Sequence, residues 1–175
     1  GRISVKDWIK VVKCAHSIGI SSTSTIMYGH IESYTHITKH LSILKDIQKE
    51  TGGFTEFVPL SFVHTEAPMY NRKLIDGIRN GATGVEVLKM HAIARIYLNN
   101  NIDNIQVSWV KEGPRMGQIL LESGANDFGG TLINESISTS AGASFGQLLK
   151  PKMIRNLIHK MGKIPAQRKS DYQII

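Results

Sequence analysis

The sequence has very little cysteine: Cys14 is the only one among 175 residues. One thiol excludes an internal disulfide, and it excludes any zinc or iron–sulfur site that needs several thiolates from this chain. Such cysteine usage is typical of a reducing compartment, so we expect a cytoplasmic protein. Because Cys14 falls within an expected helix, we interpret it as a small packed side chain rather than a reactive one.

Long apolar runs are also missing. No stretch approaches the ~20 apolar residues of a membrane-spanning helix, and the opening residues GRISVKDWIK lack the apolar core of a signal peptide. We therefore expect no membrane partner. Apolar residues make up 41% and charged residues 20% of the chain, which is typical of one folded domain.

Acidic residues are the minority among the charged ones, which gives a formal net charge of +7. This excess fits either a polyanionic partner or a solvated basic surface. The basic residues of segment 150–169 lie largely on the polar side of an amphipathic helix, with no aromatic residues between them. A solvated face is therefore favoured, and we expect no nucleic-acid partner.

Several catalytic motifs are absent as well. There is no G-x-G-x-x-G, Walker or G-x-S-x-G pattern, so the sequence supports neither a phosphate-binding loop nor a serine nucleophile. His36 and His40 have the i, i+4 spacing of a helical metal pair, but no acid follows His36. We interpret this pair as part of a solvated helix face and expect no metal site in this chain.

Helical periodicity and short β-branched runs alternate along the chain. The first helix is expected to begin at Ser4, which has Asp7 at capping-box spacing, and to end at Gly19. The later helices are expected to open at Thr35 or Thr38, at the capping box Thr83–Glu86, at Pro114 and at Pro151. The expected strands are 21–27, 54–60, 104–110 and 125–132.

This alternation predicts an α/β fold with parallel strands and right-handed crossovers. Four such units are half of an eight-stranded barrel. We therefore predict that residues 1–162 form the C-terminal half of a TIM-type (β/α) barrel, and that residues 163–175 form a basic, irregular tail. A self-contained four-stranded α/β domain is the alternative.

Polar side chains fall near the carboxyl ends of these strands, where parallel sheets bind ligands. They are Tyr28, His30, Glu32, Glu56, His64, Gln106, Ser108, Asn126 and Asp127. Glu56 is the most informative, because an acid in a strand covered by helices is buried and needs a partner. His64 lacks a metal-binding context and is more often a hydrogen-bonded loop histidine, although it lies in a loop, 61–80, of a length that is often functional.

Five stretches together resemble one enzyme family. They are TSTIMYGHIE, TGGFTEFVPLSFVH, NIQVSWVKEG, GANDFGGTLINE with the following SAGA, and the closing PAQRKSDYQ. They are similar to the C-terminal half of the radical S-adenosylmethionine enzymes that build the deazaflavin chromophore Fo, specifically the tyrosine-using 4-hydroxybenzyl transferase subunit of Fo synthase. The aminofutalosine synthase and futalosine cyclase of the menaquinone pathway are close relatives and remain alternatives.

The resemblance implies a transferase that uses a [4Fe–4S] cluster and S-adenosyl-L-methionine to generate a radical. It implies that the 4-hydroxybenzyl group of L-tyrosine moves onto 5-amino-6-(D-ribitylamino)uracil, and that the Fo-forming radical enzyme is a partner subunit. The cofactor supplies the difficult chemistry, while the protein supplies positioning and excludes water.

The resemblance also implies roles for residues. The family's G-x-I-x-G-x-x-E stretch is matched here only at Gly29 and Glu32. We therefore expect Tyr28 and Gly29 to pack against the nucleoside of the cofactor, and Glu32 to fix the loop. The expected substrate contacts are Glu56, His64, Gln106, Ser108, Asn126 and Asp127; no catalytic residue is predicted. Ser61 replaces the second proline of a PLPFVH-like segment.

One departure from the family is large. Its cluster motif, C-x-x-x-C-x-x-C, lies in the N-terminal half, and Cys14 cannot supply three thiolates. We therefore expect this chain to be a fragment that is inactive alone. A non-catalytic half-barrel that binds a partner is the alternative from a different functional class.

Overall fold

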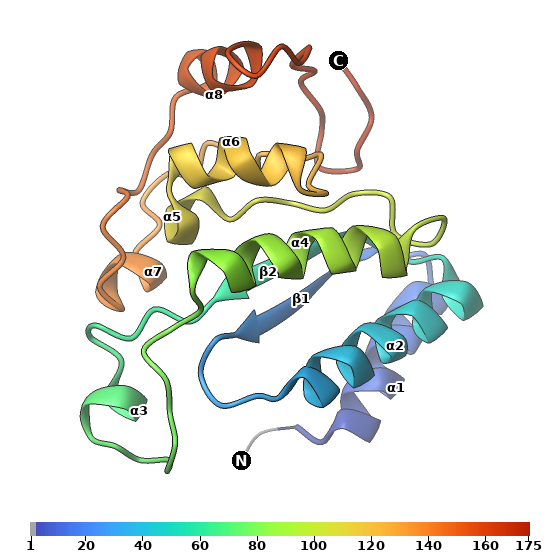
Figure 1. Cartoon of the computed structure of the whole chain (residues 1–175). Helices are drawn as coiled ribbons and strands as arrows, with labels where there is room; N and C mark the ends of the chain where they lie inside the picture. The colour runs from blue at the N-terminus through green and yellow to red at the C-terminus, as the bar shows by residue number, and fades with distance from the viewer. Residues whose placement is uncertain (1–2) are drawn as a thin grey trace.

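The computed structural model describes residues 3–175, in which eight helices and two strands occur (Figure 1). In chain order the elements are α1 (Val5–Ser17), β1 (Ser22–Tyr28), α2 (Tyr34–Thr51), β2 (Phe54–Ser61), α3 (Pro68–Asn71), α4 (Gly84–Leu98), α5 (Trp109–Glu112), α6 (Pro114–Glu122), α7 (Ile137–Ser140) and α8 (Pro151–His159). The predicted mixed α/β class is confirmed. None of the helices in the described residues is long and apolar enough to cross a membrane.

The sheet is parallel, as the alternating pattern predicts. β1 pairs with β2, with Thr23 opposite Glu56 and Tyr28 opposite Ser61. Beyond β2 the ladder continues through two single parallel bridges, Phe57 with Ile105 and Gln106 with Asp127. The four expected strand segments therefore lie next to one another in chain order, although only two of them are full strands.

The predicted strand 104–110 is wrong in its second half. The carbonyl oxygen of Ser108 accepts hydrogen bonds from the amides of Lys111 and Glu112, each at 3.0 Å, and so turns the chain into α5. The indole N–H of Trp109 donates to the carbonyl oxygen of Gly130 at 2.9 Å, which keeps this large ring buried.

The predicted strand 125–132 is also too long. Asp127 Oδ1 accepts a hydrogen bond from the amide of Gly129 at 2.6 Å, and Gly129 has a φ of +77°. A side chain that folds back on its own backbone two residues later makes a turn, and the left-handed glycine cannot continue the ladder. The strand-like geometry therefore ends at Asp127.

Helices α2 and α4 cover one face of the two strands (Figure 1). Ser24, Ile26 and Tyr28 of β1 are buried on this face, and the intervening residues of β1 are exposed. The helical side of the core includes Leu41, Leu44, Ile47, Met90, Ala94 and Leu98. Full burial of a Leu, Ile or Met side chain contributes about 2 kcal/mol, so this layer holds the sheet in place.

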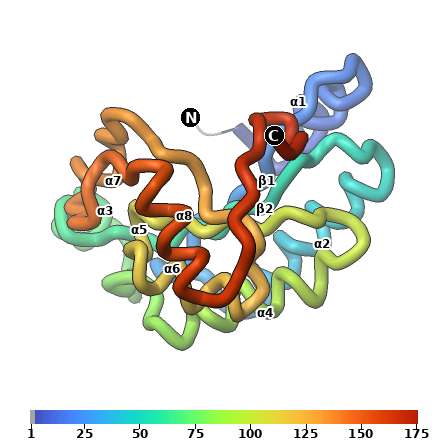
Figure 2. The backbone as a smooth tube through the Cα atoms, turned by 90° about the horizontal axis from the view of Figure 1, so that it is seen from above, coloured from blue at the N-terminus to red at the C-terminus, as the bar shows by residue number. Residues whose placement is uncertain are grey.

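The opposite face of the sheet is formed by Thr23, Thr25 and Met27 of β1 and, by register, Glu56, Val58 and Leu60 of β2. We call it the tail face, because the C-terminal segment crosses it. In Figure 2 this segment runs over the strands labelled β1 and β2. An antiparallel bridge between Arg168 and Ile174 folds the segment into a small hairpin. The tail contains no helix or strand, as expected for an irregular segment, but it is docked on the sheet.

The helix starts follow the sequence closely. Ser4 caps α1, Thr83 and Glu86 form the predicted capping box of α4, and Pro114 and Pro151 begin α6 and α8. The start of α2 lies earlier than Thr35, because Ser33 is its cap. Its hydroxyl accepts from the amide of His36, and His36 Nδ1 accepts from the amide of Ser33 at 3.2 Å.

Two expectations about isolated side chains are corrected. Cys14 is exposed on α1 rather than packed, since it lies on the side of the helix away from the core. The solvated helix face expected for His36 and His40 is corrected for His40, which is half-buried and has its Nε2 atom 2.9 Å from the carbonyl oxygen of Thr25 on β1.

Candidate functional site

Three side chains from distant parts of the chain meet on the tail face. Glu56 lies on β2, Gln106 on the bridged segment beside it and Tyr172 on the C-terminal segment. The carboxylate oxygen Oε2 of Glu56 accepts hydrogen bonds from Gln106 Nε2, at 2.6 Å, and from the hydroxyl of Tyr172. Burial, followed by this bond to Glu56, raises the pKa of Tyr172, so its phenol remains a donor.

An ion pair lies next to this cluster. Arg168 Nε donates to Asp127 Oδ2, and their side chains are 23% and 9% exposed. The guanidinium also lies over the ring of Tyr172, at 4.0 Å from the centroid. Burial acts to lower the pKa of Arg168, but the hydrogen bond and charge of Asp127 raise it above its ordinary value. We call Glu56, Gln106, Asp127, Arg168 and Tyr172 the tail-face cluster.

The tail-face cluster lies toward the amino ends of the strands. Glu56 is the third residue of β2 and is opposite Thr23, the second residue of β1. The expectation that Glu56 would project from a carboxyl strand end is therefore wrong. What the structure does bring together, as expected, is Glu56, Gln106 and Asp127 on adjacent strand segments.

Glu32 organises the loop at the carboxyl end of β1. Its carboxylate accepts hydrogen bonds from the amides of Gly29, His30 and Ile31 at 2.6, 3.0 and 3.1 Å. Burial acts to raise the pKa of Glu32, but the bonds from backbone amides outweigh it and hold the pKa below its ordinary value. Glu32 thus fixes the loop, which is the role expected from the sequence.

Tyr28 and Gly29 lie in the wall between sheet and helices. Tyr28 is 2% exposed and points to the helix-covered face. A Cβ on Gly29 would lie 2.4 Å from the amide nitrogen of Ala82, so this glycine allows two backbones to touch. Neither residue lies on the tail face with the cluster.

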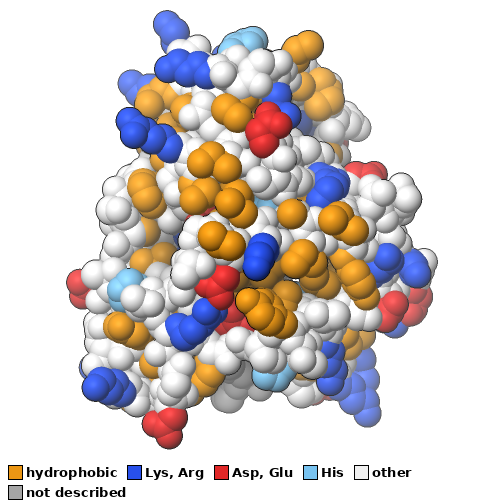
Figure 3. Space-filling model, viewed as in Figure 1, with side chains coloured by type: hydrophobic (Ala, Val, Ile, Leu, Met, Phe, Trp, Pro, Cys, Tyr) orange, Lys and Arg blue, Asp and Glu red, His pale blue; other side chains and the backbone are white. Residues whose placement is uncertain are grey.

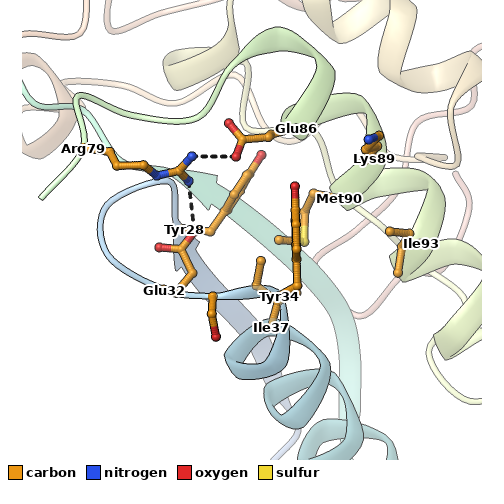
Figure 4. Close-up of a pocket in the computed structure, with 10 residues that line it drawn as sticks. Tyr28, Glu32, Tyr34, Ile37, Arg79, Glu86, Lys89, Met90 and Ile93 are labelled. Atoms are coloured by element: carbon orange, nitrogen blue, oxygen red, sulfur yellow. Dashed lines mark hydrogen bonds and ion pairs between the residues drawn. The ribbon is translucent and has the colours of Figure 1, made fainter. Parts of the chain in front are cut away.

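A cavity of about 340 Å³ lies between α2 and α4 beside this loop (Figure 4). Tyr28, Tyr34, Ile37, Met90 and Ile93 give it an apolar lining. At its rim Arg79 Nη1 lies 2.6 Å from Glu86, and Arg79 Nη2 lies 3.6 Å from Glu32. In Figure 3 apolar and charged side chains gather around the hollow between these helices.

A buried carboxyl group lies behind the carboxyl end of β2. Glu112 lies on α5, and its Oε1 atom is buried without a hydrogen-bond partner among the described residues. Burial raises the pKa of Glu112. Its charge contributes, after burial, to raising the pKa of Tyr28, whose buried hydroxyl also has no partner in residues 3–175.

Three predicted contact residues lie apart from the tail-face cluster. The ring of His64 packs edge-on against Tyr70, with centroids 4.9 Å apart, in the loop after β2. Ser108 is the cap residue of α5. Asn126 Oδ1 accepts from the amide of Ile105 and from Arg95 Nη2, each at 2.8 Å, and so joins α4 to the bridged segments.

The loop that holds His64 is locked to the small-residue segment around α7. The amide of Glu66 donates to the carbonyl oxygen of Ala141 at 3.0 Å. A Cβ on Gly142 would lie 2.5 Å from the Cβ of Thr65. The glycine and alanines of the SAGA stretch thus let a second loop pack directly against the first.

Arg168 and Tyr172 are the cluster residues that sequence reasoning missed. The sequence pattern places Arg168 among the basic residues of a solvated face, and its pairing with Asp127 shows that this interpretation is wrong for Arg168. The available signal was the closing stretch PAQRKSDYQ, which was part of the family resemblance and contains both residues.

The described residues contain no group of three or more His, Cys, Asp or Glu side chains that could hold a metal ion. The exposed Cys14 on α1 is the single thiol of the chain. The residues present therefore do not fit an iron–sulfur cluster.

Comparison with curated proteins finds close relatives. The chain is 54% identical over 174 residues to the 5-amino-6-(D-ribitylamino)uracil–L-tyrosine 4-hydroxyphenyl transferase of Methanococcus aeolicus, covering 99% of this chain and 47% of that protein. For the transferases of the same name from Methanocaldococcus jannaschii and Methanospirillum hungatei, the identities are 52% and 54%, covering 99% and 98% of this chain and 48% and 46% of theirs. The chain thus spans about half the length of these relatives.

A family profile gives the same result. Residues 51–175 match the one described as the CofH/MqnC C-terminal region. The match includes β2, both bridged segments and all five residues of the tail-face cluster. The chain therefore belongs to the CofH/MqnC C-terminal family.

Proposed function

We propose that this chain is the C-terminal half of a radical S-adenosylmethionine transferase that moves the 4-hydroxybenzyl group of L-tyrosine onto 5-amino-6-(D-ribitylamino)uracil during Fo synthesis. The observation that carries the proposal is the 54% identity, over 99% of this chain, to the 5-amino-6-(D-ribitylamino)uracil–L-tyrosine 4-hydroxyphenyl transferase of Methanococcus aeolicus. Because this chain covers 47% of that relative, the activity belongs to a longer protein. Its product then passes to the Fo-forming partner enzyme. A cytoplasmic location stays a prediction.

We propose that the complete protein contains a TIM-type barrel and that residues 1–162 form the C-terminal half of it. Four adjacent parallel segments in chain order support it. The free edge of β1 supports it too, since no strand among residues 3–175 pairs there. We propose that this edge pairs with a strand of the other half-barrel.

The proposed reaction starts with a radical that a [4Fe–4S] cluster and S-adenosyl-L-methionine supply when bound. The cluster does not fit the residues of this chain, so its ligands must lie outside these 175 residues. We propose that Tyr28, Gly29 and Glu32 shape the wall beside the cofactor. Glu32 would act indirectly, by holding the loop amides that it already binds.

The chain's own part in the reaction is to bind substrates and exclude water. Glu56, Gln106 and Asp127 are the proposed polar contacts on the tail face, where they are already ordered by hydrogen bonds. His64 and Ser108 remain predicted contacts on the carboxyl side of the sheet. Asn126 remains predicted as well, with its side-chain oxygen engaged by Arg95 and Ile105.

The test is an anaerobic assay of the complete, cluster-loaded protein with L-tyrosine and 5-amino-6-(D-ribitylamino)uracil. We expect 5′-deoxyadenosine and the hydroxybenzylated uracil by mass spectrometry. The 175-residue chain alone should give neither product. Turnover by the isolated chain, or turnover only of menaquinone-pathway substrates by the complete protein, would contradict the proposal.

A further inference from the structure

Glu56 has one occupied and one unoccupied carboxylate oxygen. Oε2 accepts hydrogen bonds from both Gln106 and Tyr172, whereas Oε1 accepts none from the residues that the structure describes. Arg168, the neighbouring cation, donates to Asp127 instead. The Glu56 side chain is only 7% exposed, and its Oε1 atom is free to accept further donors. A ligand on the tail face can supply them.

Gln106 places a second acceptor beside the first. Its Nε2 atom donates to Glu56, which fixes the amide so that Oε1 points elsewhere. This oxygen accepts no hydrogen bond from residues 3–175 and lies against Gly129, where a Cβ would be 3.2 Å from it. Two neighbouring acceptors are complementary to a ligand that presents two N–H or O–H donors.

We propose that Glu56 and Gln106 recognise the pyrimidine substrate, rather than L-tyrosine, and that Tyr172 and Arg168 are positioning residues that fix these acceptors. The inference rests on the proposed function and assigns one of its two substrates to a named site. An aminopyrimidine carries several N–H donors in one plane. The α-carboxylate of tyrosine needs a cation, and the cation of this cluster, Arg168, is already engaged by Asp127.

The C-terminal segment is the part that fixes the site. Arg168 is tied to Asp127 and stacks on the ring of Tyr172 at 4.0 Å. This contact holds the phenol where its hydroxyl meets Glu56. Removal of that hydroxyl leaves the carboxylate with one restraint, Gln106, and lets its oxygens rotate.

The experiment measures the dissociation constants of 5-amino-6-(D-ribitylamino)uracil and L-tyrosine by calorimetry on the complete protein. Tyr172→Phe should weaken uracil binding about fivefold to tenfold, the loss typical of one hydrogen bond. Glu56→Gln should weaken it more, because it removes the charged acceptor. Affinity for tyrosine should stay within about twofold in both variants. Tyr97→Phe is the matched control, since Tyr97 lies on α4, its ring packs under Lys45, and no described residue forms a hydrogen bond with its hydroxyl.

The outcomes separate this assignment from the proposed function. Equal weakening of both substrates with a lower melting temperature would show a structural role for Tyr172 and overturn the assignment. Selective loss of tyrosine binding would overturn the assignment too, because it would show that these residues bind L-tyrosine. If the unmodified protein binds both compounds and neither variant changes either affinity, the proposed function stands and this inference fails. Binding of neither compound by the unmodified protein would overturn both.

Discussion

Tyr172 and Glu56 are 116 positions apart in the chain and are joined by a hydrogen bond on the tail face of the sheet. This contact closes the chain on itself, because Glu56 lies in the second strand and Tyr172 follows the last helix. It also places the C-terminal segment among groups that the proposed substrates would meet. The segment therefore belongs to the candidate site as well as to the fold.

The ion pair Arg168–Asp127 should hold the C-terminal segment in place. Asp127→Asn leaves the guanidinium partly buried without its charge partner, so we expect a loss of about 2 kcal/mol in the free energy of unfolding. Trypsin should then cut after Arg168 and Lys169 severalfold faster. The matched control is Glu122→Gln in the exposed pair Lys163–Glu122, which should cost less than about 1 kcal/mol. Equal cleavage in the two variants would argue against this anchoring.

Gly29 should tolerate no side chain. It has a φ of +89°, and a Cβ would lie 2.4 Å from the amide nitrogen of Ala82. Gly29→Ala should therefore lower the free energy of unfolding by about 3 kcal/mol, measured by urea denaturation. Gly19 is the control, because its φ is +83° but nothing lies within 4 Å of its Cβ position. Gly19→Ala should cost only the backbone strain, about 1 kcal/mol; similar losses at the two glycines would refute the steric explanation.

Glu32 should make the protein sensitive to acid. Its pKa is lowered in the folded state by backbone hydrogen bonds that outweigh burial. A lowered folded-state pKa stabilises the protein above the unfolded-state value and loses that stabilisation as the pH falls through the folded-state value. The melting temperature should therefore fall between about pH 5 and pH 3. Glu32→Gln should melt lower at neutral pH and show a flatter pH profile; a profile as steep as the parent's would exclude Glu32 as the cause.

Glu112 should have the opposite effect to Glu32 on the pH dependence of stability. Burial raises its folded-state pKa, so its protonated form is favoured by folding. That stabilisation is present below the unfolded-state pKa and is lost as the pH rises through the folded-state pKa. Glu112→Gln keeps the shape and removes the charge. The variant should therefore melt higher than the parent at pH 7, with the difference shrinking as the pH falls toward about 4. A variant that is destabilised at pH 7 would show that the charge of Glu112 is compensated.

Local signals in the sequence were sufficient for most element boundaries. Ser4, the pair Thr83–Glu86, Pro114 and Pro151 act on backbone groups within a few residues of themselves, and each begins its helix as predicted. The α2 cap was misplaced because His36 replaces the acid of an ordinary capping box.

Features that depend on contacts outside the local sequence pattern could not be predicted from it. The fourth strand segment ends at Asp127 because the Asp127 side chain accepts a hydrogen bond from the amide of Gly129. Apolar periodicity does not reveal such a turn. The positions of Tyr172 and Arg168 on the tail face depend on partners more than 40 positions away in the chain. Composition alone makes such residues look like an ordinary basic tail. The family resemblance identified the stretch but not the role of its side chains.

The interlocked loops after β2 and around α7 have a dynamic consequence. Thr65 and Gly142 leave no space between the loops, and the amide of Glu66 is bonded to Ala141. We therefore expect the two loops to open as one cooperative unit, so that their amides exchange hydrogen for deuterium together.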